Sequence, residues 1–166
     1  MSELGEMIRV PAARFERRLP RPIELVWQHL ADPSMLPQWF EADSEIEGRE
    51  GGRVRLNGGH IRGVVTQWRP PTRLAYTWDV FGPDEDISPY PESCLTLELE
   101  AIGDEVRLTL LHLPVLERFE RQNAMGWATF LDILTDALVG EPVQPRRAYM
   151  ERNAARYGVE LANLAR

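Results

Sequence analysis

His112 is the side chain of this sequence best suited to chemistry near neutral pH, because an unperturbed imidazole gains and loses a proton there. Alternating apolar residues along 105–113 place it on the face of Leu108 and Leu110, which we expect to be covered. A covered imidazole needs a hydrogen-bond partner, since an unpaired buried polar group destabilises the fold. Three interpretations stay open: a structural histidine tied to a backbone carbonyl or to the terminal helix, a polar anchor for a ligand, and a general acid or base.

Aromatic side chains form the second candidate set. Tyr76 and Trp78 alternate with smaller residues and project from one face, while Trp39 ends a short predicted helix and Trp127 begins a long one. As core residues they supply large apolar area. As cavity lining, the Trp and Tyr side chains also bring one polar atom each, which suits a mostly apolar ligand. The sequence leaves both interpretations open.

Other patterns that carry chemistry are missing from the sequence. There is no phosphate-binding glycine loop and no His-x-x-x-His or Glu-x-x-His pair. Cys94 falls on the strand face opposite Leu95, and nothing close in sequence would activate its thiol. The carboxylates of Asp79, Glu98 and Glu100 also fall away from the covered face, so no buried acid–base pair is indicated. We therefore predict no catalytic residue, no metal ligand and no cofactor, and we favour binding over catalysis.

Composition narrows the partners and the compartment. The formal net charge is −7, from 19 basic and 26 acidic residues, which argues against nucleic acid because duplex binding needs a basic face. No stretch approaches the roughly 18 apolar residues of a membrane span. A single cysteine forms no internal disulfide, and the amino-terminal residues lack the apolar run of a signal peptide. We expect a cytoplasmic protein that does not enter membranes.

The elements that must position these residues follow from periodicity and turn chemistry. We predict a first strand at 13–19, a helix from Pro22 to about Ala31, and a short second helix from Pro33 to Trp39. After them the period changes to that of strands separated by Gly, Pro and Asn turns, which is typical of an antiparallel meander. The six predicted strands are 44–49, 53–56, 61–68, 74–81, 93–101 and 105–113.

The last strong pattern is a long one-sided helix from Arg121 to Val139. Its apolar stripe contains Trp127, Phe130, Leu131, Leu134 and Leu138, with Thr129, Asp132 and Asp136 on the polar side, and Gly140 is a suitable stop. Roughly 19 residues at 1.5 Å each give about 28 Å, enough to cross several strands. We therefore expect this helix to cover one face of the sheet and to help wall an apolar cavity.

This order of elements resembles the helix-grip arrangement of the START-like (SRPBCC) superfamily, and local matches point to the branch similar to the carboxy-terminal domain of the activator of Hsp90 ATPase. Those matches are Pro22–Pro33 (PIELVWQHLADP), Leu36–Phe40 (LPQWF), Gly63–Val65, Pro70–Trp78 (PPTRLAYTW), Leu108–His112 (LTLLH), and Gly126-Trp127 leading into Phe130–Leu134.

The resemblance implies an α+β fold in which a curved antiparallel sheet of about six or seven strands wraps around a long C-terminal helix, with two short helices after the first strand. It covers 13–140, leaving a flexible amino terminus at 1–12 and a partly helical C-terminal extension at 141–166. The acidic, proline-rich loop at 82–92 and the extension depart from the family's pattern.

The function we predict is binding of a small apolar or amphipathic molecule between the sheet and the long helix. Two alternatives come with the resemblance: an Hsp90 cochaperone-like interaction module, and a cyclase- or hydrolase-like enzyme acting on a hydrophobic substrate. Self-association as a homodimer also stays open, because two-fold dimers are the commonest oligomers. The predicted ligand-binding residues are Trp39, Tyr76, Trp78, Leu97, His112, Trp127, Phe130 and Leu134.

Overall fold

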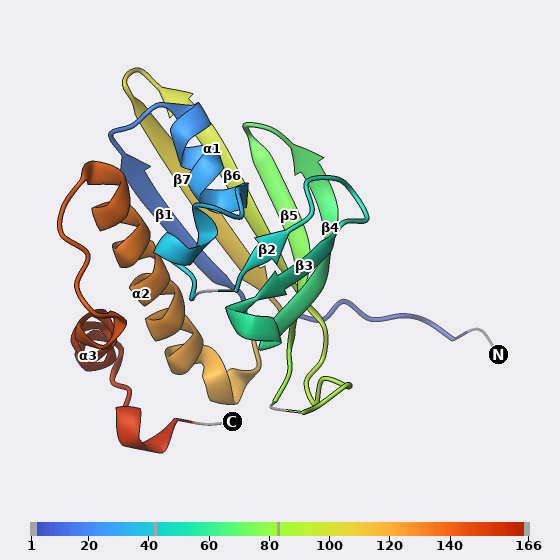
Figure 1. The fold of residues 1–166 in the computed structure, drawn as a ribbon. Helices are drawn as coiled ribbons and strands as arrows, with labels where there is room; N and C mark the ends of the chain where they lie inside the picture. The colour runs from blue at the N-terminus through green and yellow to red at the C-terminus, as the bar shows by residue number, and fades with distance from the viewer. Residues whose placement is uncertain (1–2, 42, 83, 165–166) are drawn as a thin grey trace.

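A computed structural model describes residues 3–41, 43–82 and 84–164 of the chain (Figure 1). Its strands are β1 (Ala13–Leu19), β2 (Glu45–Ile46), β3 (Arg53–Leu56), β4 (Ile61–Arg69), β5 (Arg73–Val80), β6 (Ser93–Ile102) and β7 (Glu105–Leu113). The α-helices are α1 (Ile23–Ala31), α2 (Glu120–Val139) and α3 (Arg146–Tyr157), with 3₁₀ turns at Leu36–Gln38, Asn57–Gly59, Glu117–Phe119 and Leu161–Asn163.

The seven strands form one antiparallel sheet in the order β1-β7-β6-β5-β4-β3-β2. Strict alternation along β6 and β7 buries one face of the sheet, because successive side chains of a strand point to opposite sides. The long helix α2 lies along this face beside β1, and α1 packs over β6 and β7 (Figure 1). This curved sheet gripped against a long helix is the predicted α+β helix-grip fold, which the structure confirms.

Helix α2 also confirms its predicted stripe and its end. Trp127, Leu131, Leu134 and Leu138 are buried against the sheet. Gly140 follows with φ of 78°, a left-handed conformation that closes the helix and that glycine adopts without a steric cost. The predicted start at residue 121 is one residue later than the observed one.

Two predicted elements are shorter than expected. Of the predicted strand 44–49, Glu45–Ile46 form β2, and the amide of Glu47 adds one more hydrogen bond to the carbonyl of Arg53 in β3. The chain then bends, and the amide of Gly51 donates to the carbonyl of Val65. The predicted helix at 33–39 is a single 3₁₀ turn at 36–38. Pro37 has no N–H to bond the carbonyl four residues earlier, so an α-helical ladder cannot form there.

The extension beyond Gly140 forms helix α3, which packs against the outer side of α2 and is seen end-on in Figure 1. Tyr149 donates its hydroxyl hydrogen to Asp136 at 2.6 Å, and the fully buried amide of Asn153 donates to Asp132 at 3.0 Å and to Thr129 at 3.3 Å. The polar side of α2, which the sequence marked by Thr129, Asp132 and Asp136, is therefore the surface on which α3 docks.

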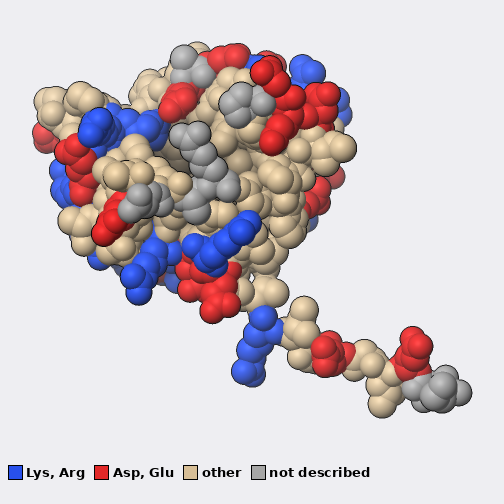
Figure 2. All heavy atoms as spheres, turned by 90° about the horizontal axis from the view of Figure 1, so that it is seen from below, with Lys and Arg blue, Asp and Glu red and all other residues tan. Residues whose placement is uncertain are grey.

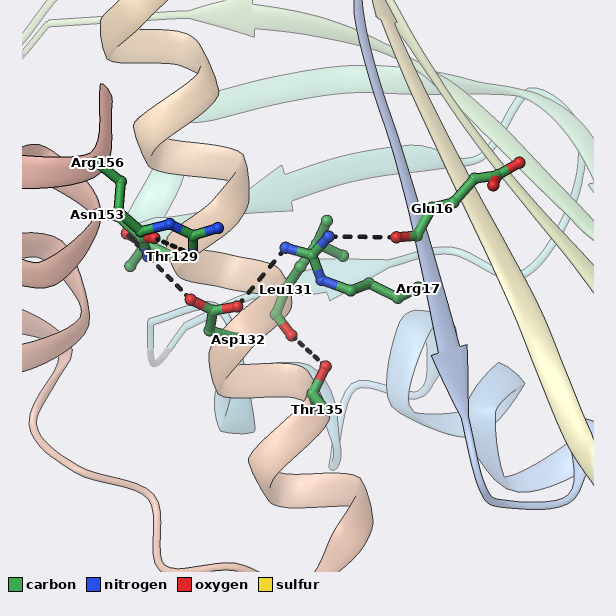
Figure 3. Close-up of polar contacts among 8 residues, drawn as sticks. All are labelled: Glu16, Arg17, Thr129, Leu131, Asp132, Thr135, Asn153 and Arg156. Carbon is green, nitrogen blue, oxygen red and sulfur yellow. Dashed lines mark hydrogen bonds and ion pairs between the residues drawn. The ribbon is translucent and has the colours of Figure 1, made fainter. Parts of the chain in front are cut away.

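One carboxylate of α2 joins three elements in this region. Figure 3 shows Asp132 between Asn153 of α3 and Arg17 of β1, whose guanidinium lies 3.6 Å from Asp132 Oδ1. Arg17 also donates to the backbone carbonyl of Glu16, and Arg156 donates to the side-chain oxygen of Asn153. These bonds tie the edge strand, the long helix and the extension together.

Residues 3–12 form an extended arm outside the sheet, anchored where the amide of Val115 donates to the carbonyl of Pro11 at 2.9 Å. Figure 2 shows the arm projecting from the body, and it shows acidic and basic side chains interspersed on the face seen from below. That face carries no continuous basic surface of the kind a nucleic-acid duplex requires. No helix among the described residues is long and apolar enough to cross a membrane.

Candidate functional site

The predicted site residues come together on the covered face of the sheet. Tyr76 and Trp78 project from β5, Leu97 from β6 and His112 from β7, while α2 contributes three more and Trp39 follows the 3₁₀ turn. All are buried apart from Phe130, which is partly exposed. The residues supplied by α2 are Trp127, Phe130 and Leu134.

Seven aromatic rings, which we call the aromatic cluster, fill the region between β5, β7 and α2. Trp78 lies at its centre, with ring centroids 4.9 Å from Trp127, 5.6 Å from His112 and 6.3 Å from Tyr76. Phe40 and Phe130 are 5.0 Å apart and connect this group to the 3₁₀ turn. The members are Trp39, Phe40, Tyr76, Trp78, His112, Trp127 and Phe130. Six of them were predicted from the sequence, and Phe40 was not.

His112 is hydrogen-bonded at both ring nitrogens. The indole N–H of Trp127 donates to Nδ1 at 3.0 Å, and because an indole can only donate, Nδ1 must carry a lone pair. The hydroxyl of Ser93 donates to the carbonyl of Trp78 at 2.8 Å and lies 2.8 Å from Nε2. Its single hydrogen is already used, so Nε2–H donates to the Ser93 oxygen. His112 is therefore neutral, with its proton on Nε2.

Burial also lowers the pKa of His112, to about 4. A neutral imidazole whose two nitrogens are occupied by protein groups has no free lone pair with which to accept a substrate proton. Of the three interpretations of His112, this geometry matches the first, a structural histidine that is hydrogen-bonded to a side chain of the terminal helix.

Two polar atoms in this region are buried without any hydrogen-bond partner among the described residues. They are the hydroxyl of Tyr76 and Oδ1 of Asn123. Tyr76 is fully buried, and the loss of hydration raises the pKa of its hydroxyl. Tyr76 belongs to the aromatic cluster, and Asn123 borders it, because the Asn123 side-chain nitrogen lies 3.2 Å from His112 Nδ1. An unpaired buried polar atom costs free energy, so the apolar cluster contains two unused hydrogen-bonding positions.

Phe130 is where the cluster reaches the surface, and the extension covers it. The guanidinium of Arg146 lies 4.7 Å from the centroid of the Phe130 ring and donates to the carbonyl of Trp39 at 2.7 Å. Partial burial lowers the pKa of Arg146, an effect opposed by the nearby charge of Glu41. One side chain from beyond residue 140 thus bridges the two elements that flank this end of the cluster.

Sequence reasoning missed four residues of this arrangement. Asn123 could have been found, because it lies four residues before Trp127 and such pairs share a helix face. Ser93 stands opposite Trp78 in the β5–β6 register, which the sequence alone did not specify. Phe40 sits in an irregular segment, and Arg146 lies in the extension, so periodicity placed neither of them.

Other surfaces of the described residues offer less. Two surface hollows, one lined by Thr72, Arg73, Glu98, Leu99, Glu100, Arg107 and Thr109 and one by Leu116, Glu117 and Arg118, contain no member of the aromatic cluster. The part of the chain that the structure describes holds no group of three or more His, Cys, Asp or Glu side chains arranged for a metal ion.

The chain was compared with known protein sequences and with solved structures. Comparison with curated protein sequences found no match. Among solved structures, CalU16 from Micromonospora echinospora is 26% identical with a TM-score of 0.71, covering 89% of this chain and 86% of its own. An Hsp90 activator from Plasmodium falciparum, at 19% identity and TM-score 0.65 over 79% and 97% of the two chains, shares the fold.

A third relative, the Aha1 dimer from Colwellia psychrerythraea, is 22% identical with a TM-score of 0.64 and likewise shares the fold, over 77% of this chain and 96% of its own. The family model described as activator of Hsp90 ATPase homolog 1-like protein matches residues 20–139, which include every predicted site residue. The chain therefore belongs to the activator of Hsp90 ATPase homolog 1-like family.

Proposed function

We propose that this protein binds a small apolar or amphipathic molecule between the covered face of the sheet and α2, in contact with the aromatic cluster. The observation that carries the proposal is the hydroxyl of Tyr76, which is fully buried beside Trp78 with no partner among the described residues. A core that served packing alone would gain stability from phenylalanine at this position, because removing an unpaired buried polar atom removes its desolvation cost. A ligand with one polar group gives the hydroxyl a use.

The rings of the aromatic cluster contact one another in this structure, so a ligand is accommodated by separating them. Phe130 is the partly exposed ring of the cluster, and the guanidinium of Arg146 stacks over it. Trp78 and Trp127, by contrast, are almost fully buried. We expect the ligand to enter at Phe130 and to lie against the inner tryptophans, Tyr76, Leu97 and Leu134.

Native mass spectrometry of the purified protein, followed by extraction and identification of bound molecules, tests this proposal. We expect a retained small molecule, and its release in Trp78→Leu, which removes the ring that the ligand contacts while keeping the position apolar. A Glu85→Gln variant, at an exposed position between β5 and β6, is the control and should retain the ligand. A protein that carries no ligand and takes up none from a panel of apolar compounds would refute the proposal. The same spectra report any homodimer, which the dimeric relative makes worth testing.

A second candidate function is the Hsp90 cochaperone-like one, and family membership is the observation that favours it. The binding proposal and this one are separable, because a cochaperone acts through its surface. Addition of the protein to an Hsp90-type ATPase should change the ATPase rate if this candidate is right. An unchanged rate at saturating protein would remove it.

The cyclase- or hydrolase-like alternative finds no support in His112. General base catalysis requires a nitrogen lone pair facing the substrate, and here Nδ1 is occupied by Trp127 while Nε2 carries the proton donated to Ser93. We place the proposed binding function in the cytoplasm, the compartment that a single, exposed cysteine favours.

A further inference from the structure

The hydrogen bonds around His112 form a series in which every donor points toward β5. The outermost atom of the series is an amide oxygen, which can only accept. The Ser93 hydroxyl donates to the Trp78 carbonyl, His112 Nε2–H donates to Ser93, and Trp127 and Asn123 both donate to His112 Nδ1. Each donor in this hydrogen-bond series is therefore already used on the side toward β5. Its outer end is the Oδ1 of Asn123, which is buried and unpartnered.

The orientation of the Asn123 amide is fixed by its neighbours. Turning the amide over would bring Oδ1 against the lone pair of His112 Nδ1, and moving the imidazole proton to Nδ1 would set it against the indole N–H of Trp127. Either change replaces an attraction by a repulsion. Asn123 consequently presents its oxygen, not its nitrogen, as the unused atom.

We propose that Asn123 Oδ1 receives a hydrogen bond from the ligand, so that the site selects neutral molecules with a hydroxyl or N–H donor on an apolar, ring-like body. This inference rests on the binding function proposed above and names the ligand chemistry for the same site. A ligand without a donor leaves Oδ1 buried and unpaired, as it is in the free protein, and loses what the bond would add. Around Trp78 the rings of Phe40, His112 and Trp127 are tilted and that of Tyr76 is stacked, and these aromatic faces favour a flat apolar body.

An anionic ligand fits the interior poorly. A carboxylate at this position would set its lone pairs against Oδ1, with only a neutral imidazole close by. The cation that contacts the aromatic cluster, Arg146, stacks on Phe130 at the surface end. A carboxylate would therefore bind at the rim, beside Arg146, and leave Asn123 unused.

Four probes that share one ring system separate these possibilities: naphthalene, 2-naphthol, 2-methoxynaphthalene and 2-naphthoate. Binding is followed by NMR through the indole N–H signals of the five tryptophans, one of which belongs to the hydrogen-bond series around His112. Because 2-naphthol is intermediate in size between naphthalene and 2-methoxynaphthalene, better fit alone cannot make it the tightest of the three. We expect 2-naphthol to bind about tenfold tighter than either, as a hydrogen bond to a buried acceptor allows.

The variant Asn123→Leu, similar in size, should lower the 2-naphthol preference to near unity while naphthalene still binds. Asn123→Ala serves as a second variant if leucine perturbs folding. Arg121→Leu, at an exposed position of the same helix, is the matched control and should keep the tenfold ratio.

The outcomes distinguish the two proposals. If no probe binds the wild-type protein, the binding function itself fails. If the neutral probes bind equally, or the preference survives in both Asn123 variants, binding stands and the role of Asn123 is refuted. Tightest binding by 2-naphthoate would likewise overturn it and point to the rim at Arg146.

Discussion

Acidification should destabilise this protein through His112, and the structure sets the size of the effect. The pKa of His112 falls from 6.5 to about 4 on folding because the imidazole is buried. Above pH 6.5 the ring is neutral in both states, so its full contribution is present there. As the pH drops below 6.5 the unfolded chain takes up a proton that the folded protein refuses, and the free energy of unfolding decreases until about pH 4.

At 1.36 kcal/mol per pKa unit, this gap corresponds to about 3 kcal/mol, of which about 2 kcal/mol is lost by pH 5. Other groups titrate over the same range, so the useful quantity is the difference between the wild-type protein and His112→Asn. Asparagine can still accept from the indole of Trp127 but does not titrate. Urea unfolding at pH 7.5, 6.0 and 5.0 should show the advantage of the wild-type protein shrinking by about 2 kcal/mol.

A wild-type advantage that stayed constant between pH 7.5 and 5.0 would refute this reasoning. An independent check comes from the imidazole nitrogen signals in NMR spectra, which distinguish the two tautomers and the cation. The hydrogen bonds to Trp127 and Ser93 require the neutral Nε2–H form at pH 6. A His112 ring already protonated at that pH would show that the hydrogen bonds are not formed as described.

Three further substitutions probe separate parts of the structure. Tyr76→Phe removes an unpaired buried hydroxyl and should raise the free energy of unfolding of the ligand-free protein by about 1 kcal/mol in urea; a loss of stability would mean that the hydroxyl has a partner. Asn153→Ala removes two buried hydrogen bonds between α3 and α2, including the one to Asp132, and should cost about 2 kcal/mol, whereas an unchanged transition midpoint would show that α3 does not dock. In Gly126→Ala the new Cβ meets no atom within 4 Å, so this variant should stabilise α2 by up to about 1 kcal/mol. In Gly63→Ala the Cβ would lie 1.9 Å from a backbone oxygen of β5, so this variant should not fold. Equal thermal midpoints for the two variants would contradict this packing.

The sheet and α2 were predictable because both have one buried side. Alternation along β6 identified Leu95, Leu97 and Leu99 as one face, and the period of α2 placed Trp127 and Leu134 on one stripe. Burial in the structure follows those patterns. Because both patterns show which side chains become buried on folding, they also identified most of the aromatic cluster.

Helix α3 could not be predicted to dock, because it uses polar groups that a hydrophobic pattern leaves out. Asn153 is fully buried and donates to Asp132, which the sequence placed on the polar side of the helix. The role of Asn123 was missed for a similar reason. Its spacing to Trp127 places Asn123 on the right helix face, but the direction of its hydrogen bond to His112 depends on three-dimensional partners that the sequence does not show.

We expect the two ends of the aromatic cluster to impose different requirements on the proposed ligand, one on its entry and the other on its selection. At the surface end Arg146 is held by one hydrogen bond to the Trp39 carbonyl and by stacking on Phe130, each worth about 1 kcal/mol. Moving it therefore costs little compared with separating Trp78 from Trp127, which are buried on all sides. Arg146 also lies in the extension, beyond residue 139, where the family match ends. We therefore expect the extension to govern how readily the proposed ligand enters, and Asn123, inside the matched residues 20–139, to govern which ligand stays.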